Sequence, residues 1–74
     1  MLPLGLYRHV KGGLYVVEQL VLNCTNNTHD ATYVLYWSVK IGAGKKFVRD
    51  LEEFTELVRW SDGSRKPRFI QEIL

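Results

Sequence analysis

A single cysteine, Cys24, is present in the 74-residue sequence, so the chain cannot form an internal disulfide. Small secreted domains usually depend on such cross-links because their cores are modest. No apolar run approaches the roughly 18 residues of a membrane-spanning helix, and the first residues lack the basic segment and long apolar stretch of a signal peptide. These absences predict a cytoplasmic protein that is neither secreted nor embedded in a membrane.

Neither positive nor negative charge is in large excess. Ten basic and eight acidic residues give a formal net charge of +2. Dedicated nucleic-acid-binding domains usually carry a strongly basic face. The basic residues of the second half are instead interleaved with acids, which are Asp50, Glu52, Glu53 and Glu56. This pattern is typical of a mixed, solvated surface.

Proline is scarce, with two copies, and the six glycines fit tight turns rather than a flexible chain. The hydrophobic share of 46% is that of an ordinary globular chain. The length predicts one domain over 1–74 with a small core, since a chain this short buries only about 60% of its unfolded surface. The apolar residues 1–4 are predicted to be either a flexible N-terminal segment or a docking segment.

Apolar and β-branched residues recur in short runs that predict about five strands joined by turns. The predicted strands cover residues 6–10, 14–22, 31–39, 46–49 and 68–70, with a further hairpin that begins at 58–60 around the turn 61–63. Glycines at 12–13 and 42–44 favour turns because glycine accepts a positive φ without a Cβ clash. The predicted fold class is therefore mainly β, a small SH3-like antiparallel barrel whose closure removes exposed edges.

Alternation assigns faces within the strands. In 14–22 it places Leu14, Val16, Glu18 and Leu20 on one face and the residues between them on the other. In 31–39 it groups Thr32, Val34, Tyr36 and Ser38. In the first strand it separates Arg8 from His9, so one of these two polar residues is expected to face inward or to lie at the rim.

Residues 50–57 are predicted to form one or two helical turns. Asp50 is suited to cap the first turn, and Glu53, three residues later, completes a capping-box pattern. Phe54, Leu57 and Val58 then form a short apolar stripe at helical spacing.

No arrangement of residues indicates an active site. His9, His29 and Cys24 lack a short-range zinc spacing, so we expect neither a metal site nor a cofactor. Cys24 has no positioned base in its polar loop, and the acidic run at 50–56 favours a surface over a general acid–base pair. The chain is therefore predicted not to be an enzyme.

Nine of the 74 residues are aromatic, more than so small a domain is expected to bury completely. Exposed Tyr, Trp and Arg side chains anchor protein interfaces, and aromatic residues beside Lys or Arg stack on nucleic-acid bases. Equally, most of these rings are expected to build the core with only their polar tips in water.

The stretches GLYRHVKGGLYVV, VLYWSV, KKFVRDLEEFTELV and KPRFIQEI follow one another along the chain. They resemble the opening, central and closing motifs of a family of small bacterial and phage proteins catalogued as a domain of unknown function. The resemblance covers nearly the whole chain and implies an SH3-like barrel. The chain departs from the family at Val10, Trp37 and Asp50, where an aromatic residue, an arginine and a proline are usual.

The size and style of the chain also resemble those of phage early proteins that bind the largest subunit of host RNA polymerase near its N-terminus. This resemblance implies a monomeric regulator that inhibits initiation by disturbing sigma-factor engagement and promotes antitermination. The expected partner-binding residues are Leu2, Leu4, Tyr7, Arg8, His9, Lys11 and Arg49. Here the two arginines donate to acidic partner groups in a geometry that lysine does not copy, and Tyr7 supplies rigid contact area.

The alternative interpretation is a nucleic-acid-binding small β-barrel. Its contacts would come from Lys45, Lys46, Arg65, Lys66 and Arg68. Such binding is expected to weaken steeply with added salt.

Overall fold

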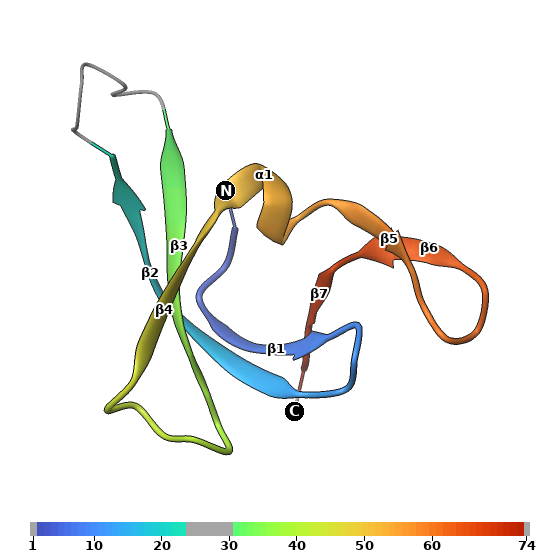
Figure 1. The fold of residues 1–74 in the computed structure, drawn as a ribbon, viewed down its shortest axis with the longest axis horizontal. Coiled ribbons are helices and arrows are strands. Elements are labelled where there is room, and N and C mark those ends of the chain that lie inside the picture. Colours follow the sequence, from blue (N-terminus) through green and yellow to red (C-terminus); the bar gives the residue numbers. More distant parts are fainter. Residues whose placement is uncertain (1, 24–30, 74) are drawn as a thin grey trace.

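The computed structural model describes residues 2–23 and 31–73, so the predicted roles of Cys24 and His29 lie outside the described residues. Within these residues the chain forms seven short strands and one helical turn (Figure 1). In chain order they are β1 (Gly5–His9), β2 (Leu14–Leu22), β3 (Thr32–Ser38), β4 (Lys46–Asp50), α1 (Leu51–Phe54), β5 (Leu57–Arg59), β6 (Arg65–Pro67) and β7 (Phe69–Gln71).

Five of the strands form one antiparallel sheet in the order β4-β3-β2-β1-β7. β5 and β6 pair only with each other, as a separate hairpin. The mainly β class and the short helical turn are therefore confirmed, but the predicted closed barrel is not found: among the described residues, β4 and β7 remain the two edges of an open sheet. The reason is that the chain between these edges is taken up by α1 and by a hairpin that pairs with itself.

The β1–β2 connection is a tight turn at the glycines that the sequence indicates. The His9 amide donates to the Gly13 carbonyl at 2.8 Å, and the Gly12 amide donates to the His9 carbonyl at 2.7 Å. Gly12 has a φ of 101°, a conformation that side chains bearing a Cβ rarely adopt.

A β-bulge interrupts the alternation of β2. Val17 pairs with Tyr36 of β3, but Gln19 pairs with the next residue, Leu35, so Glu18 is the extra residue of the longer strand. Leu20 then lies opposite the fully buried Val34 and packs against the core. The prediction that Leu20 shares the face of Leu14 and Val16 is therefore wrong, because one inserted residue exchanges the two faces.

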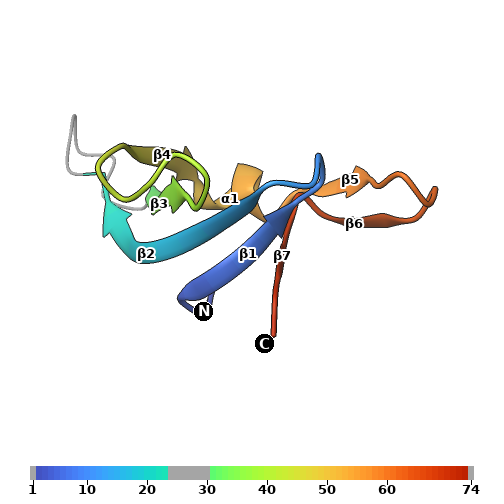
Figure 2. The ribbon, with the colours of Figure 1, turned by 90° about the horizontal axis from the view of Figure 1, so that it is seen from below.

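The core lies on the concave face of the curved sheet, which Figure 2 shows from the side. It contains six buried hydrophobic residues, Tyr7, Val17, Val34, Tyr36, Phe54 and Phe69. The Phe54 ring of α1 is stacked on Phe69 of β7 with centroids 4.0 Å apart. The rings of Tyr7 and Tyr36 meet Phe54 edge-on at 5.6 and 5.5 Å. One helical turn thus joins three strands through aromatic contacts.

The helical turn is shorter than the predicted 50–57, because Leu57 already belongs to β5. Asp50 caps it as expected, its Oδ1 accepting the Glu52 amide at 2.8 Å. Glu53 does not complete a capping box, since its carboxylate accepts a hydrogen bond from Arg49 at 2.9 Å instead. Within residues 2–23 and 31–73 there is no helix with the length and apolar character that crossing a bilayer requires.

Candidate functional site

The candidate site is β1 with the residues that flank it, because five of the seven expected contact residues fall between Leu4 and Lys11. Successive side chains of β1 leave the sheet on opposite faces. Tyr7 and His9 face the concave side, opposite Tyr15 and Phe69, whereas Arg8 faces the convex side opposite Leu14 and Ile70. The Tyr7-Arg8-His9 segment therefore serves two surfaces.

Tyr7 is a core residue and not a contact residue. Its side chain is only 2% exposed, and its Oη donates to the Pro3 carbonyl at 2.6 Å. Burial raises the pKa of the Tyr7 phenol. Its expected role as exposed contact area is therefore wrong in this structure, and what it does instead is hold residues 2–4 against the body of the domain.

Arg8 is half-exposed and held by two partners on the convex side. Its Nε donates to Glu72 Oε1 at 2.8 Å, and its Nη1 donates to the Gly12 carbonyl at 2.9 Å. The side chain remains 42% exposed. Surface ion pairs of this kind contribute only about 0–1 kcal/mol, so a partner carboxylate can replace Glu72 at little cost.

His9 lies at the concave rim among aromatic rings. Its ring centroid is 4.7 Å from Phe69 and 6.0 Å from Tyr15. Its Nδ1 accepts the Lys11 amide at 3.0 Å, so this nitrogen carries no proton. Burial, followed by the positive charges of Arg49, Arg68 and Lys11, lowers the pKa of His9.

We expect the free energy of unfolding to fall as the pH decreases from about 7.5 to 5.5. In the unfolded chain His9 titrates near 6.5, whereas in the folded chain its pKa is lower. Below 6.5 the unfolded state therefore binds the additional proton and is favoured, and above 6.5 both states are neutral and the dependence ends. Urea unfolding at several pH values measures this slope. His9→Asn, which retains an acceptor, should flatten it, and an identical slope in the variant would rule out His9 as the source.

Arg49 reaches the same concave rim from β4, on the face of the sheet opposite Arg8. Its guanidinium carbon lies 5.7 Å from the Phe69 ring centroid, and its Nε donates to the Tyr36 Oη at 3.3 Å. Its Nη1 pairs with Glu53. The structure thus brings Arg49 together with His9 through Phe69, but it does not bring either of them to the convex face of Arg8.

The remaining expected contact residues differ in exposure. Leu2 packs against the core, whereas Leu4 is 55% exposed. Lys11 is exposed in the turn. Exposed Leu4, half-exposed Arg8 and exposed Lys11 are therefore the part of the predicted set that is accessible to a partner.

Glu72 is the residue of this site that sequence reasoning missed. It follows β7 and meets Arg8 across 64 positions of sequence. Its backbone amide also donates to the Leu6 carbonyl at 2.8 Å. No local pattern indicates this contact, because it depends on β7 returning to pair with β1.

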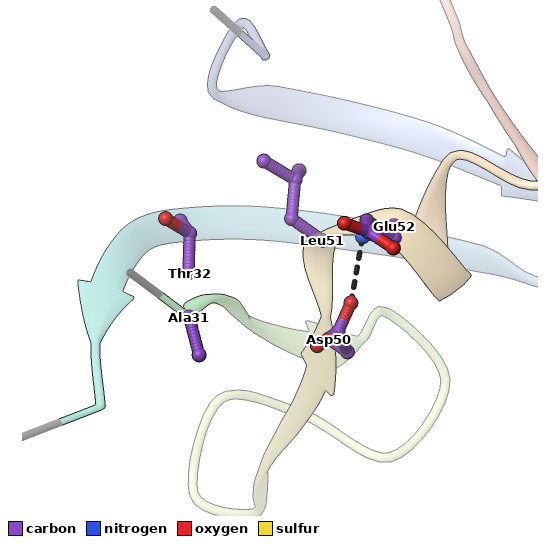
Figure 3. Close-up of a pocket in the computed structure, with 5 residues that line it drawn as sticks. All are labelled: Ala31, Thr32, Asp50, Leu51 and Glu52. Atoms are coloured by element: carbon purple, nitrogen blue, oxygen red, sulfur yellow. Dashed lines mark hydrogen bonds between the residues drawn. The ribbon is translucent and has the colours of Figure 1, made fainter. Parts of the chain in front are cut away.

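The acidic run of the sequence forms a separate surface. Asp50, Glu52, Glu53 and Glu56 line an open hollow, and a smaller one of about 120 Å³ lies beside it. The smaller hollow, shown in Figure 3, is lined by Ala31, Thr32, Asp50, Leu51 and Glu52. The dashed line marks the capping hydrogen bond from the Glu52 amide to Asp50, so this hollow lies beside an ordinary capped start of α1. Among the described residues, no three His, Cys, Asp or Glu side chains are placed to hold a metal ion.

The residues of the nucleic-acid alternative do not form one face. Lys45 and Lys46 lie at the β3–β4 turn, and Arg65, Lys66 and Arg68 lie at the other end of the molecule (Figure 1). Three of the five are engaged in ion pairs: Lys46 with Glu18 at 2.5 Å, Lys66 with Asp62 at 3.3 Å and Arg68 with Glu56 at 2.6 Å.

Comparison with known proteins confirms the family resemblance. The family described as "Protein of unknown function (DUF1653)" matches residues 5–71. The chain is also similar to the crystal structure of a DUF1653 protein from Bordetella bronchiseptica, with 28% sequence identity and a TM-score of 0.77. That likeness covers 99% of this chain and 92% of the Bordetella chain. A search of curated proteins finds no significant match.

Proposed function

The chain belongs to the DUF1653 family. We propose that it is a protein-binding module that regulates bacterial RNA polymerase. The observation that carries the proposal is the accessibility of the β1 segment, which has exposed Leu4 before the strand, half-exposed Arg8 within it and exposed Lys11 after it. Arginine is one of the residue types enriched in interface hot spots, and Leu4 adds an apolar contact on the same segment.

The N-terminal segment supports this proposal because it is held in place before any partner arrives. The Tyr7–Pro3 hydrogen bond and the packing of Leu2 tie the segment to the core, while Leu4 stays 55% exposed. A contact segment that is already ordered loses little conformational entropy on binding, so more of the contact energy appears as affinity.

Arg8 and Lys11 define the chemistry of the partner surface, which is acidic with an apolar recess. The Arg8 guanidinium exchanges the Glu72 carboxylate for a carboxylate of the partner. Because this ion pair is partly exposed and contributes little stability, the exchange has a low cost. Arg49 contributes from the concave rim only where the partner also reaches Phe69.

The proposed action is steric. A monomer that sits near the N-terminus of the largest polymerase subunit in the bacterial cytoplasm displaces or tilts the sigma factor and so inhibits initiation. If it stays on the elongating enzyme, the same occupancy suppresses termination. No chemical step is required of the protein.

The test is a titration of isotope-labelled protein with an N-terminal fragment of the largest polymerase subunit. We expect shifts at residues 2–12, and at least about tenfold weaker binding for the double variant Leu4→Ser/Arg8→Gln, which removes one apolar and one charged contact. Lys45→Gln is the matched control, since it removes an exposed charge at the remote β3–β4 turn.

Equal affinities of the double variant and the control would contradict this binding face. Absence of binding by the wild-type protein to the fragment and to the whole polymerase would overturn the proposed partner. A folded spectrum of the double variant excludes unfolding as the cause of any loss.

A further inference from the structure

The β5–β6 hairpin is the most isolated element of the fold. It projects at the end of the molecule opposite the outer ends of β2 and β3 (Figures 1 and 2). It adds no strand to the main sheet. Its two faces differ, because opposite residues of an antiparallel pair lie on the same side: Leu57 pairs with Pro67 and Arg59 with Arg65 on one face, and Val58 pairs with Lys66 on the other.

The face with Val58 is covered by contacts between side chains of the hairpin itself. The Trp60 indole Nε1 donates to the Pro67 carbonyl at 2.9 Å, and the Lys66 ammonium lies 5.0 Å from the Trp60 ring centroid. Lys66 also pairs with Asp62 in the turn. This aromatic ring is therefore occupied and does not offer a free stacking platform.

The opposite face places two arginines in direct opposition. Arg59 and Arg65 are exposed and paired in register, so their Cβ atoms are about 4.5–5.5 Å apart. Like charges at such positions repel and destabilise the hairpin. Among the residues that the structure describes, neither guanidinium has a hydrogen bond or an ion pair.

The one acid of the hairpin turn does not neutralise them. The Asp62 carboxylate accepts the Ser64 amide at 2.9 Å, the Ser64 hydroxyl at 2.6 Å and Lys66 at 3.3 Å. These hydrogen bonds lower the pKa of Asp62 to about 2, so it stays ionised and engaged in the turn. Asp62 is the one acid within residues 57–67, so the hydrated guanidinium groups of Arg59 and Arg65 are available to carboxylates from outside the hairpin.

Beside the two arginines the same face is apolar. Leu57 is 53% exposed, and its register partner Pro67 is half-buried. Nucleic-acid backbone presents phosphates and sugars and would leave this leucine without a partner. Two guanidinium groups next to an exposed leucine complement a protein segment that carries carboxylates beside an aliphatic side chain.

We propose that the Leu57–Arg59–Arg65–Pro67 face of the hairpin is a second docking surface, and that its partner is an acidic, leucine-containing protein segment. The partner's carboxylates form charge-assisted bonds to both guanidinium groups, preferably in the bidentate geometry that arginine allows. This surface begins where the hairpin meets the end of β1, since the Val10 amide donates to the Arg68 carbonyl at 2.9 Å, and it does not rest on the proposed polymerase partner.

The probe is a synthetic dodecapeptide of three Glu-Asp-Leu-Glu repeats, titrated into isotope-labelled protein. We expect shifts confined to residues 57–67. Arg59→Gln/Arg65→Gln should weaken binding at least about tenfold, since it removes two charged hydrogen-bonding groups. Lys40→Gln/Lys45→Gln is the matched control, because it removes the same charge from two exposed lysines and should change the affinity by less than about twofold.

A peptide with serine in place of leucine tests the apolar half of the surface, and we expect it to bind several-fold more weakly. Equal losses of affinity in the two double variants would show that the peptide responds only to the net charge of the protein, and they would overturn the proposal. Preferential binding of a twelve-nucleotide RNA at residues 57–67 would likewise overturn it in favour of nucleic acid. The arginine variant relieves a repulsion, so its fold is expected to be at least as stable as that of the wild type.

Discussion

Replacing Phe54 with alanine should cost about 3–5 kcal/mol of stability, the range for removing a buried phenylalanine ring. Phe54 is fully buried, stacked on Phe69 and in edge contact with Tyr7 and Tyr36. A 74-residue domain has a total stability of about 4–11 kcal/mol. We therefore expect the variant to lose a large part of the total stability, because the cavity forms where α1 joins the strands.

Chemical unfolding followed by tryptophan fluorescence measures this loss. Leu57→Ala is the matched control: Leu57 follows α1 closely but is 53% exposed, so its truncation should change stability by no more than about 0.5 kcal/mol. Similar losses in the two variants would contradict the placement of Phe54 at the centre of the core.

Tyr7→Ala should destabilise the domain by a similar amount, about 3–5 kcal/mol. The sequence had predicted this residue to lie on the binding surface. Tyr7 is 2% exposed and its ring contacts Phe54. Tyr7→Phe keeps the ring and removes only the Oη–Pro3 hydrogen bond, so it should cost about 1 kcal/mol. The difference between the two variants separates packing from hydrogen bonding.

The same denaturation experiment measures both variants, and an amide spectrum of Tyr7→Phe reports on residues 2–4. We expect those amides to shift because Pro3 loses the bond that ties the segment to the core. If Tyr7→Ala were as stable as the wild type, the ring would not be buried. Partner binding that fails with Tyr7→Ala but persists with Tyr7→Phe identifies a folding defect and not a lost contact.

Much of the secondary structure could be predicted from local patterns. The limits of β2 match the predicted 14–22, and the buried residues Val34, Tyr36 and Ser38 of β3 share the face that alternation assigns. Asp50 caps the helical turn as expected. These features depend on side chains within a few positions of each other, so one stretch of sequence contains the necessary information.

The sequence predictions failed where contacts between segments far apart in the sequence determine the local structure. Glu18 looks like one residue of a regular strand, and only its pairing with β3 makes it the extra residue of a bulge. Glu53 is correctly spaced for a capping box, but Arg49 competes for its carboxylate. Closure of the barrel depended on β4 meeting β7, which no local pattern specifies.

By itself the sequence determined the class of the protein, a small mainly β domain without disulfides, and the family to which it belongs. The tertiary structure alone decided which polar residues are accessible. It buried Tyr7, bound Arg8 to Glu72 from the far end of the chain and left Arg59 and Arg65 facing solvent. The physical reason is that strand periodicity is local, whereas exposure is set by the pairing of segments that lie far apart in the sequence.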